Sequence, residues 1–390
     1  MKILILHQYF KTPQGGGAIR SYYLARALVE GGHQVIVITS HGESTYKKES
    51  FEGIEVHYLP VPYDNRFSFT ARVGAFRKFA MGASRLAVKL EGIELCYAIS
   101  VPLTVGLVAR WLKFRKDIPY YFEVGDLWPD APIQLGFIKN IFLKRSLYVL
   151  ERLIYRYAES IIALSPAIQS AIEKKVLDKK VHLIPNMADC EFFYPEVKRH
   201  GLEDRFDVKG KFVVSYIGAL GIANGLDYLL ECANASRKSE LPVHFILCGD
   251  GAMQADLKSN AKRLGLQNIS FVAFANRDTV KEILNVTDAA FVCYKNVPIL
   301  ETGSPNKFFD GLAAGKLIIA NFGGWIRKEI ESNKCGIFVD PQHPTDFTKK
   351  IQPFLSNLAL LQEYQTASRA LGEKKYSRKK LSQSFRDLFA

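Results

Sequence analysis

The chain has 390 residues, of which 48% are hydrophobic and 23% charged, so it has a globular composition and the length for two ordinary domains. Its formal net charge is +13, which implies attraction to an anion without identifying it as nucleic acid, phosphate or lipid. The six cysteines include no CxxC pair, which argues against a disulfide framework or a zinc site and favours reduced thiols in the cytoplasm.

The N-terminus, MKILILHQYF, predicts a first strand and not a signal peptide or membrane anchor, because only four consecutive apolar residues precede His7. The longest weakly polar run, 95–109, falls short of the roughly 18 apolar residues that indicate a membrane span. We therefore expect no transmembrane helix.

The first half of the chain alternates strands and helices. An apolar run at 2–6 is followed by the glycine loop 15–17, a helix-spaced segment at 21–28 and a second apolar run at 35–39. This pattern predicts a β-loop-α-β unit, because parallel strands need such a crossover. Further strands are predicted at 54–59, 95–99, 120–124, 160–164 and 181–184.

A polar stretch at 186–210 with mixed charges is interpreted as a linker, after which the alternation begins again. The second half predicts strands at 212–217, 243–248, 269–274, 289–294, 317–321 and 336–339. The predicted fold class is α/β, with two doubly wound Rossmann-like domains at 1–190 and 205–375 and a final helix at 376–390 that packs back on the first domain. A ligand cleft is expected between the domains, at the carboxyl ends of their strands.

Three glycine-rich loops do not match known phosphate-binding motifs. The segments 15–20 and 249–254 lack the last glycine of GxGxxG, which argues against dinucleotide-dependent hydride transfer. The segment 310–317 lacks the first glycine and the Ser/Thr of a P-loop, which argues against a magnesium-dependent NTPase. Any one of these loops taken alone is more simply a βα turn.

The segment 301–316, ETGSPNKFFDGLAAGK, combines several signals. Ser304 is suited to the N-cap, Pro305 to the first helical position and Gly315 to the residue after the C-cap, so a helix of about ten residues is predicted. Lys307 lies in the first turn, where the helix dipole disfavours a cation unless an anion joins it. The amides of 303–306 and this ammonium would together bind a diphosphate, and Asp310, one turn on, would accept hydrogen bonds from vicinal sugar hydroxyls. The alternative is an amphipathic helix with a surface Lys–Asp pair.

Because of several short motifs and their order along the chain, the sequence resembles the retaining glycosyltransferases of family 4, which have the GT-B fold. The motifs are the 15–17 glycines, Gly32-His33, Ser165-Pro166, Ile184-Pro185-Asn186, 218–225, 249–251 and 304–315. Asp126-Leu-Trp-Pro-Asp130, 221–226 and 304–310 are similar to the bacterial branch that adds amino sugars to polyprenyl-linked O-antigen or capsule precursors.

The resemblance implies which residues contact the substrates. Asp310 matches the second residue of the family's acidic pair, whereas the first falls on Thr302 with Glu301 beside it. The Arg…Lys pair that grips the diphosphate in the family is absent from 219–225, so Lys307 would carry more of that charge. The expected donor-binding residues are Gly16, Gly17, Gly218, Asn224, Gly249, Phe274, Glu301, Thr302, Gly303, Ser304, Asn306 and Asp310.

The expected catalytic residues are Asp126, Lys307 and Glu123. Asp126 and Glu123 lie where a buried strand enters a loop, although Glu123 could equally be a loop carboxylate or a cap. In the family, retention is ascribed to front-face attack in which the leaving phosphate helps to take the acceptor's proton. No divalent metal and no cofactor are expected, and the chain has no DxD motif.

Two basic segments of the first half, 66–90 and 138–157, mix positive and apolar side chains as membrane-surface helices do. The expected acceptor or membrane residues are Arg66, Arg72, Arg77, Lys78, Lys144 and Arg145. The alternative is that the apolar residues face the core and the bases are solvated. Nucleic-acid binding is disfavoured because no recognised module is present.

The resemblance thus implies an enzyme that transfers a sugar, expected to be N-acetylated, from a UDP-sugar to a polyprenyl-diphosphate-linked acceptor in bacterial surface polysaccharide synthesis. It is expected in the cytoplasm, on the inner face of the plasma membrane. A GT-B nucleotide-sugar 2-epimerase, or a non-catalytic nucleotide-sugar-binding subunit of a transferase complex, remain alternatives.

Overall fold

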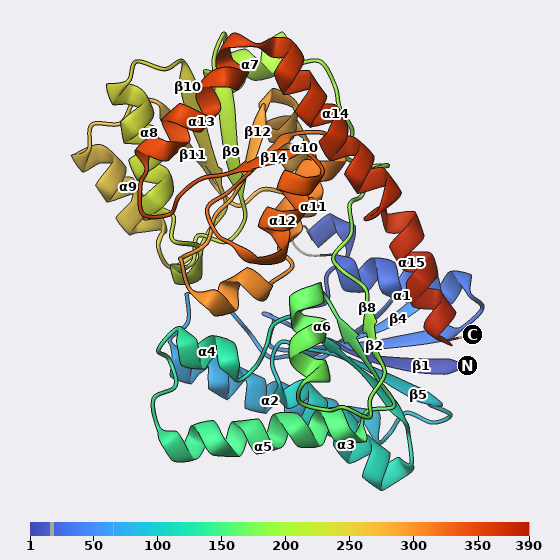
Figure 1. Ribbon diagram of the computed structural model, residues 1–390. Helices are drawn as coiled ribbons and strands as arrows, with labels where there is room; N and C mark the ends of the chain where they lie inside the picture. Colours follow the sequence, from blue (N-terminus) through green and yellow to red (C-terminus); the bar gives the residue numbers. More distant parts are fainter. Residues whose placement is uncertain (16–18, 65, 390) are drawn as a thin grey trace.

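The computed structural model describes residues 1–15, 19–64 and 66–389, which form two α/β domains stacked across a waist (Figure 1). Each domain is built on one twisted sheet with helices on both faces. The predicted fold class, GT-B with two doubly wound domains, is confirmed.

The N-terminal sheet has eight strands in the order β3-β4-β2-β1-β5-β6-β7-β8. Every neighbouring pair is parallel except β3 and β4. The strand order reverses between β1 and β5, which are aligned with Leu6 opposite Ala98. The strands are β1 (Lys2–Leu6), β2 (Gln34–His41), β3 (Lys47–Phe51), β4 (Ile54–Pro60), β5 (Leu95–Ile99), β6 (Tyr120–Val124), β7 (Ser160–Ala163) and β8 (Val181–Leu183).

Helices cover both faces of this sheet because its central strands are apolar on both sides. Ile3 and Ile5 pack with α1, whereas Leu4 and Leu6 belong to the core under α2, α3 and α5. The helices of this domain are α1 (Arg20–Glu30), α2 (Phe69–Ala87), α3 (Thr104–Lys116), α4 (Asp130–Gln134), α5 (Ile141–Tyr157) and α6 (Pro166–Glu173), with the short η1 (Pro13–Gly15) before α1.

The C-terminal sheet has six strands, all parallel, in the order β11-β10-β9-β12-β13-β14. Its strand order reverses between β9 and β12, so the loops after these two strands diverge and leave room for a ligand. The strands are β9 (Phe212–Ile217), β10 (Val243–Cys248), β11 (Ile269–Val272), β12 (Ala289–Val292), β13 (Leu317–Ala320) and β14 (Gly336–Phe338).

The helices of the C-terminal half continue past this sheet and return to the first domain. They are α7 (His200–Phe206), η2 (Ile222–Asn224), α8 (Asp227–Lys238), α9 (Gln254–Arg263), α10 (Arg277–Val286), η3 (Pro298–Thr302), α11 (Asn306–Ala313), α12 (Gly324–Ser332), α13 (Thr345–Ser356), α14 (Leu358–Lys374), α15 (Arg378–Arg386) and η4 (Asp387–Phe389). The helix α14 runs down the side of both domains, and α15 lies beside α1 (Figure 1). The ring of Phe385 on α15 lies 5.0 Å from that of Tyr97 on β5.

Two elements differ from the sequence prediction. The interpreted linker, 186–210, contains the helix α7, and the chain also has the strand β3, which the sequence did not predict. β3 reads KKESF and is mostly exposed at the edge of the sheet, where it pairs antiparallel with β4. Edge strands of this kind carry charged side chains, so they lack the apolar pattern on which strand prediction depends.

Candidate active site

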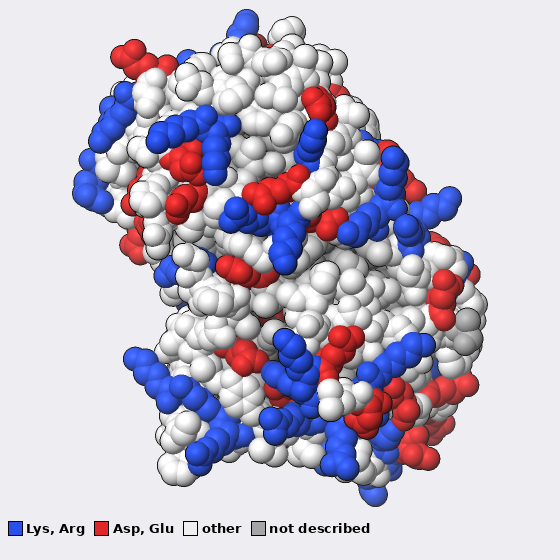
Figure 2. Space-filling model, in the orientation of Figure 1, with Lys and Arg blue, Asp and Glu red and all other residues white. Residues whose placement is uncertain are grey.

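The two domains meet where the carboxyl ends of both sheets face each other, and the space-filling outline narrows between them (Figure 2). The N-terminal domain contributes the loops after β1, β5 and β6 at this edge, and the C-terminal domain contributes the loops after β9, β10 and β12. This is the position at which doubly wound sheets bind ligands.

Lys307 lies in an aromatic cage at the reversal point of the C-terminal sheet. Its Nζ is 4.7 Å from the ring centroid of Tyr216, at the end of β9, and 4.9 Å from that of Tyr294, just after β12. Within the described ranges the ammonium makes no ion pair or hydrogen bond. Burial lowers its pKa to about 8, because the rings replace water without supplying a full counter-charge.

Asp310 lies one turn further along α11, and its carboxylate also has no hydrogen-bond partner among the described residues. Burial raises its pKa to about 7, although the nearby positive charge of Arg277 opposes that shift. The surface Lys–Asp pair that was the alternative reading is not formed by the described side chains. Lys307 and Asp310, both partly buried and without an ion-pair partner among the described residues, thus lie on one helix beside the cleft.

The ends of α11 differ in how well the sequence predicted them. Gly315 has φ +59° and directly follows the C-cap Ala314, with its amide bonded to the carbonyl of Leu312, as predicted for the residue after a C-cap. The N-cap prediction was wrong. The helix begins at Asn306 after Pro305, and the Ser304 hydroxyl makes no capping bond.

Ser304 instead joins the two domains. Its Oγ accepts a hydrogen bond from the Asn186 amide at 3.3 Å, and its carbonyl accepts one from the Asn186 side chain. The Ser165 hydroxyl likewise donates to the carbonyl of Thr302 at 2.5 Å, and the side-chain oxygen of Gln134 accepts from the amide of Ile299 at 3.2 Å. The N-terminal domain therefore fixes the loop that leads into α11.

The other predicted residues of this loop differ in their exposure and in their hydrogen-bond partners. Asn306 is exposed at the first turn of α11, and the carbonyl of Gly303 accepts a hydrogen bond from Trp325 at 2.8 Å. The Glu301 carboxylate lies against Gly323, at the start of α12, where a Cβ on that glycine would come within 3.0 Å of it. The Thr302 hydroxyl donates to the carbonyl of Ile299 at 2.7 Å, so it already has a partner.

The glycine loops after β9 and β10 are bonded to each other. Gly218 has φ +151° and Gly249 has φ +149°, and a Cβ on Gly249 would lie 1.9 Å from the carbonyl oxygen of Gly218. Their amides bond to the carbonyls of Cys248 and Val272, so these glycines permit close approach and do not present free donors. A Cβ on Gly218 would lie only 3.1 Å from the Lys307 side chain. Because glycine has no Cβ, this position leaves room for the lysine to reach the two rings.

Three further predicted donor residues have distinct positions. Asn224 is buried, and its side-chain oxygen accepts a hydrogen bond from the Gly221 amide at 3.3 Å, which shapes the loop after β9. Phe274 is 56% exposed beyond β11, with the Lys11 ammonium of the other domain 5.8 Å from its ring centroid. Gly16 and Gly17 lie outside the described residues.

Asp126 faces the Lys307 cage from the N-terminal domain. It follows β6, is exposed to the cleft, and has its pKa raised by the loss of hydration there. Burial raises the pKa of Tyr294, and the negative charge of Asp126 raises it further, so the two groups lie within electrostatic range of each other. The structure thus brings Asp126, Tyr294 and Lys307 together.

Glu123 lies away from the cleft, in the core. It is 2% exposed and binds the Arg20 guanidinium, with Arg20 Nη2 at 2.9 Å from Oε2, and it also accepts a hydrogen bond from the Tyr97 hydroxyl. Arg20 in turn donates to the carbonyl of Ile184 at 2.8 Å and to that of Pro185. This geometry favours a structural role for Glu123, as a positioning residue for the 184–186 segment.

The predicted acceptor or membrane residues lie on the N-terminal domain. Arg66 forms an exposed ion pair with Asp64, and the Arg72 Nε donates to the Phe67 carbonyl at 3.0 Å. Arg77 and Lys78 are exposed on α2, and Arg145 is exposed on α5 beside the partly buried Lys144. No helix in the described ranges is long and apolar enough to cross a bilayer.

Sequence reasoning missed several residues of this site. Tyr216 and Tyr294 form the lysine cage, Ser165 and Asn186 anchor the loop before α11, and Arg277 sets the electrostatic environment of Asp310. The tyrosines could have been found from their places at the ends of β9 and β12. Ser165 and Asn186 appeared only as motif members, without a role.

Comparison with known proteins identifies the two domains. Residues 15–187 match the family model described as "Glycosyl transferase 4-like domain", and residues 203–371 match that described as "Glycosyl transferases group 1". The putative teichuronic acid biosynthesis glycosyltransferase TuaH of Bacillus subtilis is 27% identical over 233 residues. That alignment covers 58% of this chain and 56% of the relative, so the chain spans little more than half the length of TuaH.

Solved structures share the fold over the whole chain. A sucrose-phosphate synthase from Thermosynechococcus elongatus has a TM-score of 0.79 at 15% identity, and covers 100% of this chain and 98% of its own. Anabaena HepE in complex with UDP-glucose has a TM-score of 0.72 at 16% identity, with 100% and 99% covered. The two family models occur in the order of the two domains and together leave little of the chain unmatched. The chain therefore belongs to the GT4-type glycosyltransferases with the GT-B fold.

Proposed function

We propose that this protein transfers a sugar, with retention of configuration, from a UDP-sugar to a polyprenyl-diphosphate-linked acceptor in the synthesis of a bacterial surface polysaccharide. The observation that carries the proposal is the Lys307 ammonium, which lies between the rings of Tyr216 and Tyr294 without an ion pair to any described residue. A cation kept without a counter-charge beside a helix N-terminus is suited to a diphosphate.

The donor site follows from the residues around Lys307. The backbone N–H groups of Gly303, Ser304 and Asn306 donate to no backbone carbonyl among the described residues, and they lie at the start of α11. They would bind the phosphate oxygens together with the ammonium, and Asp310 would accept hydrogen bonds from the ribose hydroxyls. UDP is the inferred carrier because the structurally similar Anabaena HepE was solved with UDP-glucose.

In the proposed reaction, Lys307 and the backbone amides would stabilise the negative charge that develops on the leaving diphosphate. Breaking the glycosyl–phosphate bond passes through an oxocarbenium-like state, while negative charge grows on the leaving diphosphate. Lys307 and the amides, fixed beforehand by the loop anchors on the N-terminal domain, would stabilise that charge. Asp126 would bind a sugar hydroxyl of donor or acceptor opposite them, and the leaving phosphate would help to take the acceptor's proton.

The acceptor is inferred from the N-terminal domain and from the relatives. The basic residues of α2 and α5 lie on the domain that would bind it, and TuaH is named for a cell-surface polymer. A glycan on a polyprenyl diphosphate would keep its lipid in the bilayer and offer its sugar end to the cleft. The donor sugar is expected to be N-acetylated.

A screen of nucleotide sugars against a short polyprenyl-diphosphate-sugar acceptor, followed by mass spectrometry, tests the proposal. We expect one added sugar with one UDP-sugar. Incubation of each UDP-sugar without acceptor, followed by NMR, detects a 2-epimerase instead. Absence of turnover by the purified chain, with UDP still bound, would favour a non-catalytic subunit.

Replacing Asp310 with alanine should weaken UDP binding about 10- to 100-fold at pH 8, because a charge-assisted hydrogen bond is worth about 1.5–3 kcal/mol. Isothermal titration calorimetry measures this directly. Glu363→Ala, at an exposed carboxylate on α14 in the same domain, is the matched control and should bind UDP as the wild type does. An unchanged affinity of the Asp310 variant would exclude the ribose assignment.

Replacing Asp126 with asparagine should lower kcat/KM by about 10- to 100-fold, since a carboxylate that accepts a sugar hydroxyl would become a weaker neutral acceptor. UDP affinity should change little, because Asp126 belongs to the opposite domain. Asp178→Asn, at an exposed position of the N-terminal domain, serves as the control. A variant with wild-type kcat/KM would place Asp126 outside the site.

Treatment with EDTA should leave turnover unchanged, because the leaving-group charge is assigned to Lys307 and backbone amides. Turnover is measured before and after chelation and again after addition of Mg²⁺ or Mn²⁺. Activity lost with EDTA and restored only by a divalent metal would overturn this part of the mechanism.

A further inference from the structure

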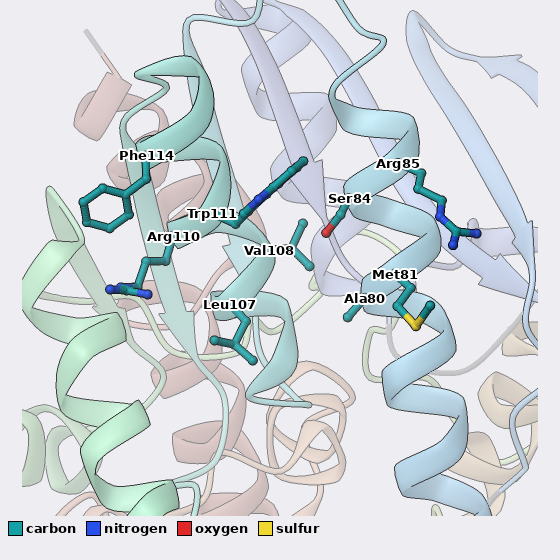
Figure 3. Close-up of a pocket in the computed structure, with 9 residues that line it drawn as sticks. All are labelled: Ala80, Met81, Ser84, Arg85, Leu107, Val108, Arg110, Trp111 and Phe114. Carbon is teal, nitrogen blue, oxygen red and sulfur yellow. The ribbon is translucent and has the colours of Figure 1, made fainter.

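A groove between α2 and α3 of the N-terminal domain lies outside the cleft (Figure 3). Its volume is about 740 Å³, and Ala80 and Ser84 on α2 point toward Val108 and Trp111 on α3, with Met81, Arg85 and Leu107 at its edges. This groove belongs to no part of the donor site described above. The helix α3 lies outside the two basic segments, 66–90 and 138–157, that the sequence singled out.

The groove exposes large apolar side chains that a soluble surface rarely groups together. Trp111 is 40% exposed, Phe114 is 59% exposed and Met81 is 48% exposed, and all three line the same cavity. On the neighbouring helix α5, Phe142 is 74% exposed. A cluster of this kind indicates an interaction surface, and aromatic side chains are favoured where that surface is a membrane interface.

Arg110 adds a cation without an ion-pair partner at the rim of this groove, on the side of α3 that points away from α2. Its guanidinium lies 4.8 Å from the ring centroid of Phe114 and 5.2 Å from that of Tyr157. Its Nε is buried and has no hydrogen-bond partner, and the side chain forms no ion pair with any described residue. A half-buried arginine held by aromatic rings is suited to an anionic group such as a phosphate.

The helices around the groove carry a positive charge, which also favours an anionic ligand. The helices α2, α3 and α5 pack side by side and carry four basic residues each. Their only acidic residue is Glu151, whose side chain is buried and paired with Lys175 at 2.8 Å. The three helices therefore carry cations and exposed apolar side chains and no exposed carboxylate of their own, although Lys113 on α3 pairs with the exposed Glu159 that follows α5.

We propose that the α2–α3 groove binds an anionic phospholipid of the bilayer, with a hydrocarbon chain against Met81, Leu107 and Trp111 and the headgroup phosphate on Arg110. The N-terminal domain would then dock on the membrane through α2, α3 and α5, with Trp111 and Phe114 entering the interface. Exposed apolar area and electrostatic attraction to anionic lipid together set the strength of such binding. This role as a docking site rests on the proposed function, in which the acceptor is lipid-linked.

The geometry would serve that acceptor. The helix α2 follows β4 and α3 follows β5, so both begin at the carboxyl edge of the sheet. The groove begins within about two turns of the N-terminus of α3. A lipid held there would keep the mouth of the cleft near the bilayer surface. A polyprenyl-linked glycan would then reach Asp126 without leaving the membrane.

The first test is flotation of the full chain on vesicles of phosphatidylcholine with and without phosphatidylglycerol. The wild type should float with the anionic vesicles, and less so at high salt. The double variant Trp111→Ser/Phe114→Ser should partition about tenfold less or weaker still, because it loses two exposed aromatic side chains. The matched control Val197→Ser/Leu358→Ser removes two exposed apolar side chains elsewhere and should float as the wild type does.

The second test locates the lipid. Phosphatidylglycerol with brominated acyl chains should quench part of the tryptophan fluorescence, and Trp111→Phe should abolish that quenching while the protein still floats. The residual fluorescence comes from Trp128, which is partly buried, and from Trp325, which is buried. Arg110→Gln should reduce the preference for anionic over neutral vesicles at least several-fold.

Failure of this inference and failure of the proposed function are distinguishable. Turnover on a short-chain, water-soluble acceptor should be unchanged in Trp111→Ser/Phe114→Ser, since the groove lies outside the donor site. If the wild type transfers sugar to that acceptor but does not float, or floats equally well after the double substitution, the docking site is wrong. If it floats through the groove but transfers no sugar, the lipid site stands and the proposed function fails.

Discussion

Replacing Lys307 with methionine should lower kcat/KM for the UDP-sugar by about 10²- to 10³-fold, the usual loss when one preorganised donor to a developing oxyanion is removed. Methionine keeps the length of the side chain and its contacts with the rings of Tyr216 and Tyr294, so the cage should survive. Only the cation opposite the leaving diphosphate is lost. Steady-state kinetics with donor varied at saturating acceptor measure the effect.

The pH profile gives the same lysine a second signature. Because the Lys307 pKa is lowered to about 8, the free enzyme loses its ammonium as pH rises through 8, and kcat/KM for the donor should fall there. Because the Asp310 pKa is raised to about 7, the carboxylate is protonated as pH falls through 7, and kcat/KM should fall on that side as well. The Lys307→Met enzyme should keep the acid limb and lose the alkaline one.

Lys316 provides a matched control for this profile. Burial lowers its pKa to about 8 too, but it lies beyond the far end of α11, away from the cleft. Lys316→Met should therefore retain the alkaline limb. If both variants keep that limb, or if Lys307→Met retains wild-type kcat/KM, Lys307 is not the counter-charge of the diphosphate.

Replacing Glu123 with glutamine should destabilise the N-terminal domain by about 3–5 kcal/mol, the cost of leaving a buried charge without its partner. The variant would strand the Arg20 guanidinium, which is 8% exposed and contacts Glu123 through Nε as well as Nη2. Differential scanning calorimetry should show a lower first unfolding transition. UDP affinity of the folded fraction should be little changed, because Glu123 lies outside the donor site.

An exposed ion pair gives the comparison. Arg327 and Glu331 are 3.1 Å apart on α12, and both are more than 40% exposed. Glu331→Gln should cost less than about 1 kcal/mol, because water screens a surface pair. Equal effects of the two substitutions would contradict the structural role assigned to Glu123, and loss of turnover with unchanged stability would return it to catalysis.

The sequence predicted the fold well where local pattern and tertiary environment agree. Strands such as 95–99, 120–124 and 212–217 were predicted with their observed bounds, because a parallel strand buried on both faces is a continuous apolar run. β3 and α7 were missed, since both are short and largely exposed and carry no such pattern. Their existence depends on β4 and on the C-terminal domain against which they lie.

The residues of the site also differ in whether the local sequence could predict them. Lys307 and Asp310 could be singled out from the sequence, because a cation in the first turn and a carboxylate three residues on are local features of one helix. Ser304 was misassigned, because its hydroxyl bonds across the domain boundary to Asn186 instead of capping its own helix. Local propensity cannot anticipate a partner 118 residues away.

The sequence by itself thus determined the two-domain α/β architecture, the family and the helix that bears Lys307. Only the tertiary structure decided that Tyr216 and Tyr294 enclose that lysine, that Asp126 lies within electrostatic range of Tyr294, and that Glu123 is buried on Arg20. The physical reason is that helix and strand signals act over a few residues, whereas the charge environment of a side chain depends on residues that folding brings together from distant strands.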